Sequence, residues 1–339
     1  MIRIVIPAYK AETTIVACVM AVLNATKNLL HYEIVITDNG GNPNLKKLLA
    51  PFPVRLISCT EKASAAYARN KGAEDLNKGI LVFIDSDVVI EANALEELIF
   101  PIQKGKAHAS IGNYSKKVTK MTFAQQFKQL YIHTVYLKEN QEIKNDYWTA
   151  IAAVDITVFH ELNGFDTSFS GANGEDQEFG IRLTQHGYTT VVASKALGKH
   201  LKTYTINGII ENDYKKGLRA LRNSQENQVP LSDNRHAKKE AMLAVFTACL
   251  GLLTLLIGIA FPITLVVALI CFISWGWNRR AFFESFHKAK GIQFSIKAGA
   301  LLFVLELVRA CCVISHLSTT FIQFLKPTKK TLPYHEPSH

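Results

Sequence analysis

The stretch Leu81-Val-Phe-Ile-Asp-Ser-Asp-Val-Val-Ile90 places two carboxylates, Asp85 and Asp87, directly after an apolar run that is typical of a buried strand. Carboxylate oxygens are hard ligands that suit Mg2+ or Mn2+, and these ions commonly keep coordination positions open for phosphate oxygens. A turn or a cap is the alternative role of the pair, because Asp and Ser are frequent in turns. The surrounding sequence decides between the two interpretations.

Apolar runs and helical patterns alternate through the first ninety residues. Strands are expected at 2–6, 33–37, 53–58 and 80–84, and helices at 13–26 and 63–74. This alternation predicts an α/β fold with a doubly wound, mostly parallel sheet of the Rossmann-like kind. Ligands bind beyond the carboxyl ends of the strands in such sheets, where Pro7-Ala-Tyr9, Asp38 and the Asp85–Asp87 pair all fall. Three strand ends at one crevice favour a metal and diphosphate site.

A second acidic pair, Glu175 and Asp176, lies in the first turn of another expected helix. Amphipathic helices are expected at 91–102 and 123–138, and a glycine-rich loop from Asn163 leads to a helix that ends at Gly187. The helix dipole favours ionised carboxylates at this position. Simple capping of the helix is the alternative role of the pair.

In this order and spacing, residues 1–225 resemble the family 2 glycosyltransferases with a GT-A fold. The motifs that carry the resemblance are Ile6-Pro-Ala-Tyr9, Ile36-Thr-Asp-Asn-Gly40, Ala68-Arg-Asn-Lys-Gly72, Asp85-Ser-Asp87, Gly164-Phe-Asp166 and Gly174-Glu-Asp176. The turn after the second strand departs from the family pattern, since Asn39 and Gly41 stand where relatives have Asp and Ser.

The resemblance implies a nucleotide-sugar site at the first strand ends. Asp38 would bind the nucleotide base, and Pro7, Ala8 and Tyr9 would line the nucleoside site. Arg69, from the motif on the expected helix at 63–74, is assigned to the same site. A UDP-sugar is the expected donor.

The resemblance also implies the residues of the chemical step. Asp85 and Asp87 would flank the sugar diphosphate, and Asp87 is the expected direct ligand of a divalent cation, Mg2+ or Mn2+. His200 falls where some relatives place a histidine near the metal, and a structural role is its alternative. Asp176 would be the general base that deprotonates the acceptor hydroxyl, with Glu175 beside it, in a single displacement that inverts the anomeric centre.

Two long apolar segments follow a basic linker at 226–240. Residues 241–277 contain no charged residue, and 298–325 contain few. Both exceed the roughly 20 residues that cross a bilayer, and buried helices of a soluble core are the alternative. The first segment would be about 55 Å long as one helix, so a hairpin that breaks near Phe261-Pro262 is expected. A basic loop at 278–297, a third helix at 298–325 that spans or lies in the interface, and a polar tail at 326–339 complete the prediction.

Charge and spacing refine this membrane prediction. The net charge of +10 is concentrated beside the apolar segments, which favours the cytoplasmic side and attracts anionic headgroups. Lys215, Lys216 and Arg219 are alternatively suited to a lipid phosphate. Glu306 and Arg309 are spaced to pair on one helix face, toward protein rather than lipid. No nucleic-acid recognition motif accompanies the charge, and the six cysteines show no metal-binding spacing.

No secretory leader is visible, because the residues from Met1 to Pro7 read as a first strand. The catalytic part is therefore expected in the cytoplasm, on the cell (inner) membrane.

The sequence thus predicts a membrane-anchored, metal-dependent, inverting glycosyltransferase. Polyprenyl phosphate, a lipid-linked saccharide and a growing polysaccharide of the cell envelope are all suitable acceptors beside apolar helices. A catalytically inactive membrane scaffold of the same fold is the alternative, although both carboxylate motifs argue against it. A nucleotidyltransferase is a third hypothesis, but Pro7-Ala-Tyr-Lys-Ala11 lacks the glycine of a triphosphate-binding loop.

Overall fold

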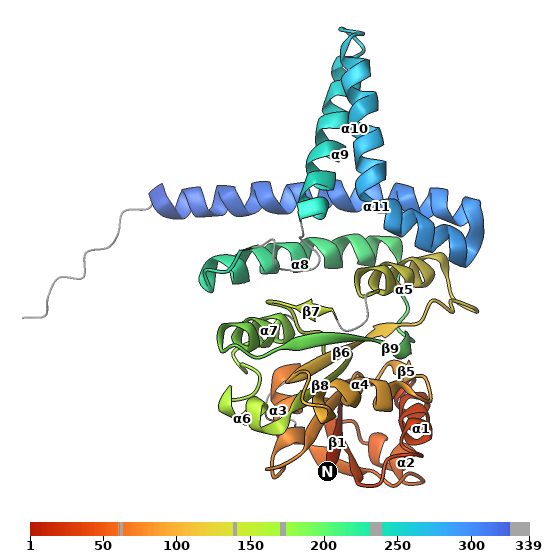
Figure 1. Ribbon diagram of the computed structural model, residues 1–339, viewed down its shortest axis with the longest axis vertical. Coiled ribbons are helices and arrows are strands. Elements are labelled where there is room, and N and C mark those ends of the chain that lie inside the picture. Colours follow the sequence, from red (N-terminus) through yellow and green to blue (C-terminus); the bar gives the residue numbers. More distant parts are fainter. Residues whose placement is uncertain (60, 62–63, 138–140, 170–173, 231–238, 326–339) are drawn as a thin grey trace, which may run out of the picture.

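The computed structural model describes residues 1–325 apart from 60, 62–63, 138–140, 170–173 and 231–238. The expected polar tail, the middle of the expected basic linker and part of the glycine-rich loop lie outside the described residues. The α/β part of the chain occupies one end of the molecule, and the helices of residues 239–325 occupy the other (Figure 1).

A nine-stranded mixed sheet forms the centre of the α/β part. Its strands are β1 (Ile2–Ala8), β2 (Tyr32–Asp38), β3 (Arg55–Ser58), β4 (Ile80–Ile84), β5 (Val88–Ile90), β6 (Ala109–Tyr114), β7 (Glu142–Ile143), β8 (Ile151–Asp155) and β9 (Thr190–His200). Their order is β3-β2-β1-β4-β8-β6-β9-β5, and β7 pairs with β9.

The sheet is parallel where the sequence alternates most regularly. Strands β1 to β4 pair in parallel, which confirms the prediction for this part. Strand β8 runs antiparallel between β4 and β6, and β5 and β7 run antiparallel to β9. The sheet is mixed beyond β4 because the chain after Asp87 no longer follows the regular alternation of strand and crossover helix.

The expected helices of the α/β part are present, with ends that differ from the prediction by up to three residues. They correspond to α1, α3, α4, α5 and α7, whereas α2, α6 and α8 were not expected. The helices are α1 (Ile15–Ala25), α2 (Leu45–Leu49), α3 (Ala65–Ala73), α4 (Ala94–Gln103), α5 (Phe123–Val135), α6 (Ile156–Glu161), α7 (Glu175–Gln185) and α8 (Ile206–Glu226).

Parallel pairing brings three strand ends to one edge of the sheet. Ala8 at the end of β1 lies opposite Asp38 at the end of β2, and Val5 lies opposite Phe83 of β4. The turn that carries Asp85 and Asp87 therefore begins beside the end of β1.

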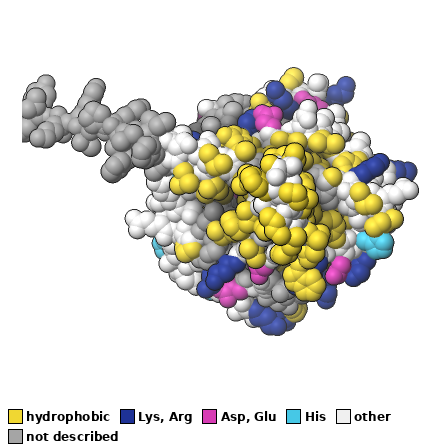
Figure 2. Space-filling view, turned by 90° about the horizontal axis from the view of Figure 1, so that it is seen from above, with side chains coloured by type: hydrophobic (Ala, Val, Ile, Leu, Met, Phe, Trp, Pro, Cys, Tyr) yellow, Lys and Arg dark blue, Asp and Glu magenta, His cyan; other side chains and the backbone are white. Residues whose placement is uncertain are grey.

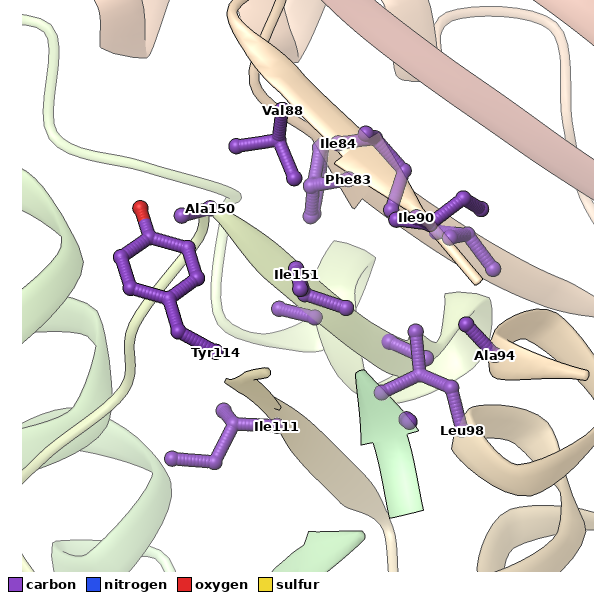
Figure 3. Close-up of a cluster of buried hydrophobic side chains, with 14 of the residues drawn as sticks. Phe83, Ile84, Val88, Ile90, Ala94, Leu98, Ile111, Tyr114, Ala150 and Ile151 are labelled. Carbon is purple, nitrogen blue, oxygen red and sulfur yellow. The ribbon is translucent and has the colours of Figure 1, made fainter. Parts of the chain in front are cut away.

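This turn is held by a packed core. Phe83 and Ile84 before the turn are buried, as is Val88 after it, and Ile84 lies opposite Ile151 in the pairing of β4 with β8 (Figure 3). Burying a side chain of this size contributes about 1.5–3 kcal/mol. Because both flanks of the turn are fixed in this way, its two carboxylates are held on a rigid base.

Helix α3 lies unusually close to the sheet. A Cβ atom at Gly72 would lie 2.3 Å from Cγ1 of Val5, so only glycine permits this contact with β1. The close approach positions Arg69, on the same helix, beside the strand ends.

The C-terminal region consists of α9 (Lys239–Ile257), α10 (Thr264–Asn278) and α11 (Arg280–Leu325). Helices α9 and α10 form a hairpin that stands away from the rest of the molecule, and α11 crosses its base above α8 (Figure 1). The predicted break near Phe261-Pro262 is therefore confirmed. By length and composition, residues 239–257 and 280–319 are apolar enough to cross a membrane.

The predicted basic loop at 278–297 is wrong, because this segment is helical except at Arg279, between α10 and α11, and at Gly291 (φ 77°, ψ −175°). The charged residues of this segment are compatible with a helix. Glu284 and Lys288 lie one turn apart and form an ion pair at 3.7 Å. Gly291 alone interrupts α11, in a backbone conformation that favours glycine.

The hairpin has an apolar surface up to its tip. Figure 2, which looks down on it, shows hydrophobic side chains gathered at the centre of this face. Ile259 and Ile263 at the tip are 86% and 77% exposed. The turn satisfies backbone groups internally, because the Phe261 amide donates to the Ile257 carbonyl and the Thr264 hydroxyl donates to the Thr254 carbonyl, both at 3.0 Å.

A buried ionic network joins the C-terminal helices to the α/β part. Arg309 of α11 donates to Glu306 at 3.1 Å, to Asp213 of α8 at 3.0 Å and to the Tyr131 hydroxyl of α5 at 3.1 Å. Arg279 contacts the same Glu306, which is fully buried, at 2.6 Å. The predicted pairing of Glu306 with Arg309 toward protein is confirmed.

Candidate functional site

A cavity of about 1210 Å³ extends from the carboxyl ends of β1 and β4 to helices α8, α9 and α11. Nearly all of the site residues predicted from the sequence line it. They are Pro7, Ala8, Tyr9, Arg69, Asp85, Asp87, Glu175, Asp176 and His200. Asp38 lies at the same sheet edge but does not line the cavity.

Asp87 and His200 meet because β5 pairs with β9. Val88 lies opposite His200 in this pairing, and the Asp87 carbonyl accepts from the Leu201 amide at 2.7 Å. Nε2 of His200 lies 3.0 Å from Oδ1 of Asp87, and Nδ1 lies 2.8 Å from the Tyr204 hydroxyl. Burial disfavours the charged form of Asp87, but the hydrogen bond to His200 and the nearby Lys202 lower the pKa of this carboxyl below its usual value.

The His200 and Asp87 side chains, with Asp85 in the same turn, have the chemistry to bind a divalent cation that takes its remaining ligands from a substrate. Two adjacent ligands at about 2.1 Å from an octahedral ion lie about 3.0 Å apart. This is also the separation of the His200 and Asp87 atoms. Among the described residues no three His, Cys, Asp or Glu side chains form a complete metal cluster. A cation here would therefore depend on other oxygens, such as those of a diphosphate.

Arg69 connects the two acidic motifs. Its side chain is almost fully buried and donates to Oε1 of Glu175 at 2.7 Å and to Oδ1 of Asp85 at 3.0 Å. Burial opposes its charge, but Asp85, Glu175 and Asp176 raise the pKa of Arg69 above its usual value. Glu175 thus holds Arg69, and Arg69 in turn fixes the orientation of Asp85.

Asp176 differs from Glu175 in its surroundings. It is half-buried and lines the cavity, and its Oδ1 accepts from the Gln177 amide at 2.8 Å. Burial and the neighbouring Glu175 raise the pKa of Asp176 to about 7, while Lys216 and Arg69 act in the opposite direction. A carboxyl group with a pKa near neutrality is suited to accept a proton from a substrate.

Gly174 sets the start of the helix that carries Asp176. Its φ is 102°, and a Cβ atom there would lie 2.5 Å from Cδ of Arg219 on α8. Both the backbone conformation and the available space therefore require glycine. Helix α8, which the sequence did not predict, thus forms one wall around Asp176.

Only some of the residues predicted for the nucleoside site line the cavity. The Asp38 carboxylate accepts from the amides of Gly40 at 3.0 Å and Asn42 at 3.1 Å, and so shapes the turn after β2. Asn39, rather than Asp38, lines the cavity at this point, together with the exposed ring of Tyr9. Base binding by Asp38 stays a prediction.

Sequence reasoning missed the aromatic and basic side chains of the cavity. The Tyr114 ring stacks on His200 at 5.3 Å and contacts Trp148 edge to face at 4.7 Å. Lys128 of α5 lines the cavity next to the buried Phe127. The position of Lys128 at the border of the apolar face of α5 was the sequence feature that could have indicated a lysine in the cavity.

Comparison with known families gives the same result as the motifs. The model described as glycosyl transferase family 2 matches residues 3–162. Residues 3–162 belong to glycosyltransferase family 2. A second model, described as the N-terminal domain of galactosyltransferase, matches residues 133–206. The two together cover both acidic motifs of the glycosyltransferase domain.

Curated relatives of the glycosyltransferase domain are themselves glycosyltransferases. Glycosyltransferase GlyG of Streptococcus pneumoniae is 29% identical over 34% of this chain and 39% of its own length. Glycosyltransferase AglE of Haloferax volcanii is 24% identical over 59% and 66%. An Escherichia coli enzyme, UDP-Glc:alpha-D-GlcNAc-diphosphoundecaprenol beta-1,3-glucosyltransferase WfgD, is 29% identical over 34% and 46%. The matched region thus spans from about two fifths to two thirds of these relatives.

Solved structures confirm the GT-A fold of the glycosyltransferase domain. Mannosyltransferase PcManGT from Pyrobaculum calidifontis, in complex with GDP-Man and Mn2+, superposes with a TM-score of 0.56 at 11% identity. The match covers 93% of this chain and 86% of that one. Residues 1–349 of TarS from S. aureus give a TM-score of 0.50 at 14% identity, over 95% and 91% of the two chains.

Proposed function

We propose that this glycosyltransferase moves a sugar from a nucleotide-diphosphate sugar to a hydroxyl of a lipid-linked or polysaccharide acceptor at a membrane surface. The observation that carries the proposal is the shared cavity, in which the Asp85–Asp87 turn and the Asp176 carboxyl both lie. The E. coli relative, named for a UDP-glucose donor and a diphosphoundecaprenol-linked acceptor, supports a UDP-sugar and a lipid-linked saccharide.

Asp87, His200 and Asp85 are the residues that would hold a divalent cation, Mg2+ or Mn2+. Such an ion stabilises the negative charge that develops on a leaving nucleoside diphosphate. The PcManGT complex with GDP-Man and Mn2+ supports this assignment by analogy of fold. Tyr204 and the stacked Tyr114 orient the His200 ring, and Arg69 orients Asp85.

Asp176 acts as the general base. The acceptor oxygen forms a bond to the anomeric carbon while the bond from that carbon to the diphosphate oxygen breaks. The proton of the acceptor hydroxyl passes to the Asp176 carboxylate, and the nucleoside diphosphate leaves with the electron pair. Attack opposite to the leaving group inverts the anomeric configuration.

The helical hairpin anchors the protein in a membrane. The 19 residues of α9 extend over about 28 Å, close to the roughly 30 Å of a hydrocarbon core. Its apolar surface and internally bonded turn support insertion, because lipid offers no partners to backbone groups. The exposed apolar side chains of α11, such as Ile292, Ile296 and Ile314, suit an interfacial position beside the hairpin.

We expect two lysines in the hairpin to release the protein from membranes. In a variant with Leu256→Lys and Ile270→Lys, each charge adds about 2.5–3.5 kcal/mol to the cost of insertion. Flotation with vesicles of neutral and anionic lipid measures the bound fraction. Phe100→Lys, at an exposed apolar position of the α/β part, is the control and should float like the unmodified protein. Undiminished flotation of the double variant would contradict anchoring by the hairpin.

A donor screen tests the proposed function directly. Membranes that contain the protein are incubated with radiolabelled nucleotide sugars and Mn2+ or Mg2+, and the lipid and polysaccharide fractions are analysed by mass. We expect one donor to label one fraction, with loss of label in excess EDTA and its return with Mn2+. Binding of nucleotide sugars without transfer or hydrolysis would favour the inactive-scaffold alternative and overturn the proposal.

A further inference from the structure

The cavity has an acidic end and a basic end. Asp87 and Asp176 line it near the strand ends, whereas Lys128 on α5 and Lys216 on α8 line it on the two helices that pack against α11, and Lys202 lines it two residues after His200. Among the residues that the structure describes, none of these three lysines forms an ion pair with a carboxylate. The basic end therefore carries lysines that no carboxylate contacts directly.

Lys128 experiences the charge of this end most strongly. Burial lowers the pKa of its ammonium group to about 8, and the positive charges of Lys216, Arg309 and Lys202 act in the same direction. Asp213 acts in the opposite direction, and its carboxylate is itself bound to Arg309 at 3.0 and 3.3 Å. Like charges in a half-buried site are unfavourable unless an anion lies among them. An anion with several oxygens would receive charge-assisted hydrogen bonds from this cluster.

The cavity wall beyond the lysines is apolar. Met242, Val245 and Phe246 of α9 face the cavity on one side, and Val313 and Ile314 of α11 on the other. Helices α9 and α11 are also the ones long and apolar enough to meet a membrane. The apolar wall thus belongs to the helices that the proposed function places at the membrane.

We infer that the basic end of the cavity binds the phosphate of a lipid acceptor, whose hydrocarbon chain lies between α9 and α11. The inference rests on the proposed function and specifies its acceptor class. Lys128 and Lys216 are the principal phosphate ligands, and the apolar walls hold the first part of the chain.

The position of Asp176 further defines this acceptor. Lys216 is close enough to act on the ionisation of both Lys128 and Asp176. The phosphate site therefore adjoins the general base. A base is needed when the nucleophile is a hydroxyl, so the acceptor is a saccharide joined to the lipid through phosphate. Its hydroxyl gives its proton to Asp176 in the transfer step described above.

Binding of short isoprenoid probes to the full chain in detergent micelles tests the inference. The probes are farnesyl diphosphate, farnesol and inorganic pyrophosphate, titrated by calorimetry with UDP present to fill the donor site. We expect farnesyl diphosphate to bind at least about tenfold more tightly than either other probe, because only it engages both ends of the site. Lys128→Met and Lys216→Gln should each weaken its binding by about tenfold or more.

The adjacent Lys215→Gln is the matched control, since this exposed lysine pairs with Glu211 on the surface at 2.5 Å. It should change the affinity by less than about twofold. Unaltered affinity in both the Lys128 and Lys216 variants would overturn the inference, as would farnesol binding as tightly as farnesyl diphosphate. Equal binding of pyrophosphate would show an anion site without a lipid path and would also overturn it. UDP affinity of the unmodified protein, measured separately, tests the donor site. Failure to bind UDP would count against the proposed function rather than against this inference.

Discussion

Replacement of Asp176 by asparagine is expected to lower the transfer rate by about 10²- to 10⁴-fold, the usual contribution of a general base. The amide has nearly the shape of the carboxylate but cannot accept the proton of the acceptor hydroxyl. The rate of product formation in saturating donor and acceptor measures the effect. Nucleotide affinity should stay within about twofold of the unmodified protein, because Asp176 does not hold the donor. Full turnover by the variant would disprove the assignment of the base.

The pH dependence of the same step provides an independent readout. Since the pKa of Asp176 is raised to about 7, the unmodified enzyme should gain activity as pH rises toward 7 and level off above it. The folded state binds this proton more tightly than the unfolded chain does, so its contribution to stability is lost as pH rises through 7. Asp176→Asn has no charge to bury, and we expect it to unfold at a higher temperature than the parent at pH 8. A lower unfolding temperature would indicate a structural role for the carboxylate.

Replacement of Asp87 by asparagine is the second variant with a large expected effect. Loss of the charge beside the diphosphate should reduce transfer by at least about 100-fold, since even the outer partners of metal ligands contribute 10- to 100-fold. The amide oxygen can still accept the hydrogen bond from His200, so the turn should keep its place. Transfer rates across a titration of Mn2+ measure the change, and the variant should need a higher Mn2+ concentration for half of its residual rate.

Asp75→Asn serves as the control for the Asp87 variant. Asp75 is an exposed carboxylate of the α/β part, 3.7 Å from Arg55, and does not line the cavity. Its replacement should leave the transfer rate and the Mn2+ dependence within about twofold of the parent, as for most surface ion pairs. An Asp87 variant that matched this control would remove the basis for a cation site at the turn.

The sequence was sufficient to predict the parts of the site that depend on local pattern. Asp85 and Asp87 follow an apolar run, and parallel pairing of strands then determines which other strand ends lie beside them. The position of Asp176 in a first helical turn was readable from the glycine before it and the periodicity after it. These features need no knowledge of distant contacts.

Features that depend on distant contacts could not be predicted in the same way. Arg69 contacts Glu175 across 106 residues of sequence, and no local periodicity encodes that contact. Lys128 lies in an ordinary amphipathic helix, and its unusual surroundings arise only when α8 and α11 pack nearby. The segment around Lys288 is helical rather than the predicted loop, because its basic residues are good helix formers as well as a membrane-flanking signal.

The network of Glu306 with Arg279 and Arg309 gives the C-terminal helices a role beyond attachment. It fixes α11 to α5 and α8, and these same helices enclose the acceptor end of the cavity. The sheet therefore closes one side of the cavity, and the C-terminal helices close the opposite side. Under the proposed function, a fragment cut after Glu226 would keep the side formed by the sheet but leave the cavity open to water, so membrane docking and catalysis would depend on the same assembly.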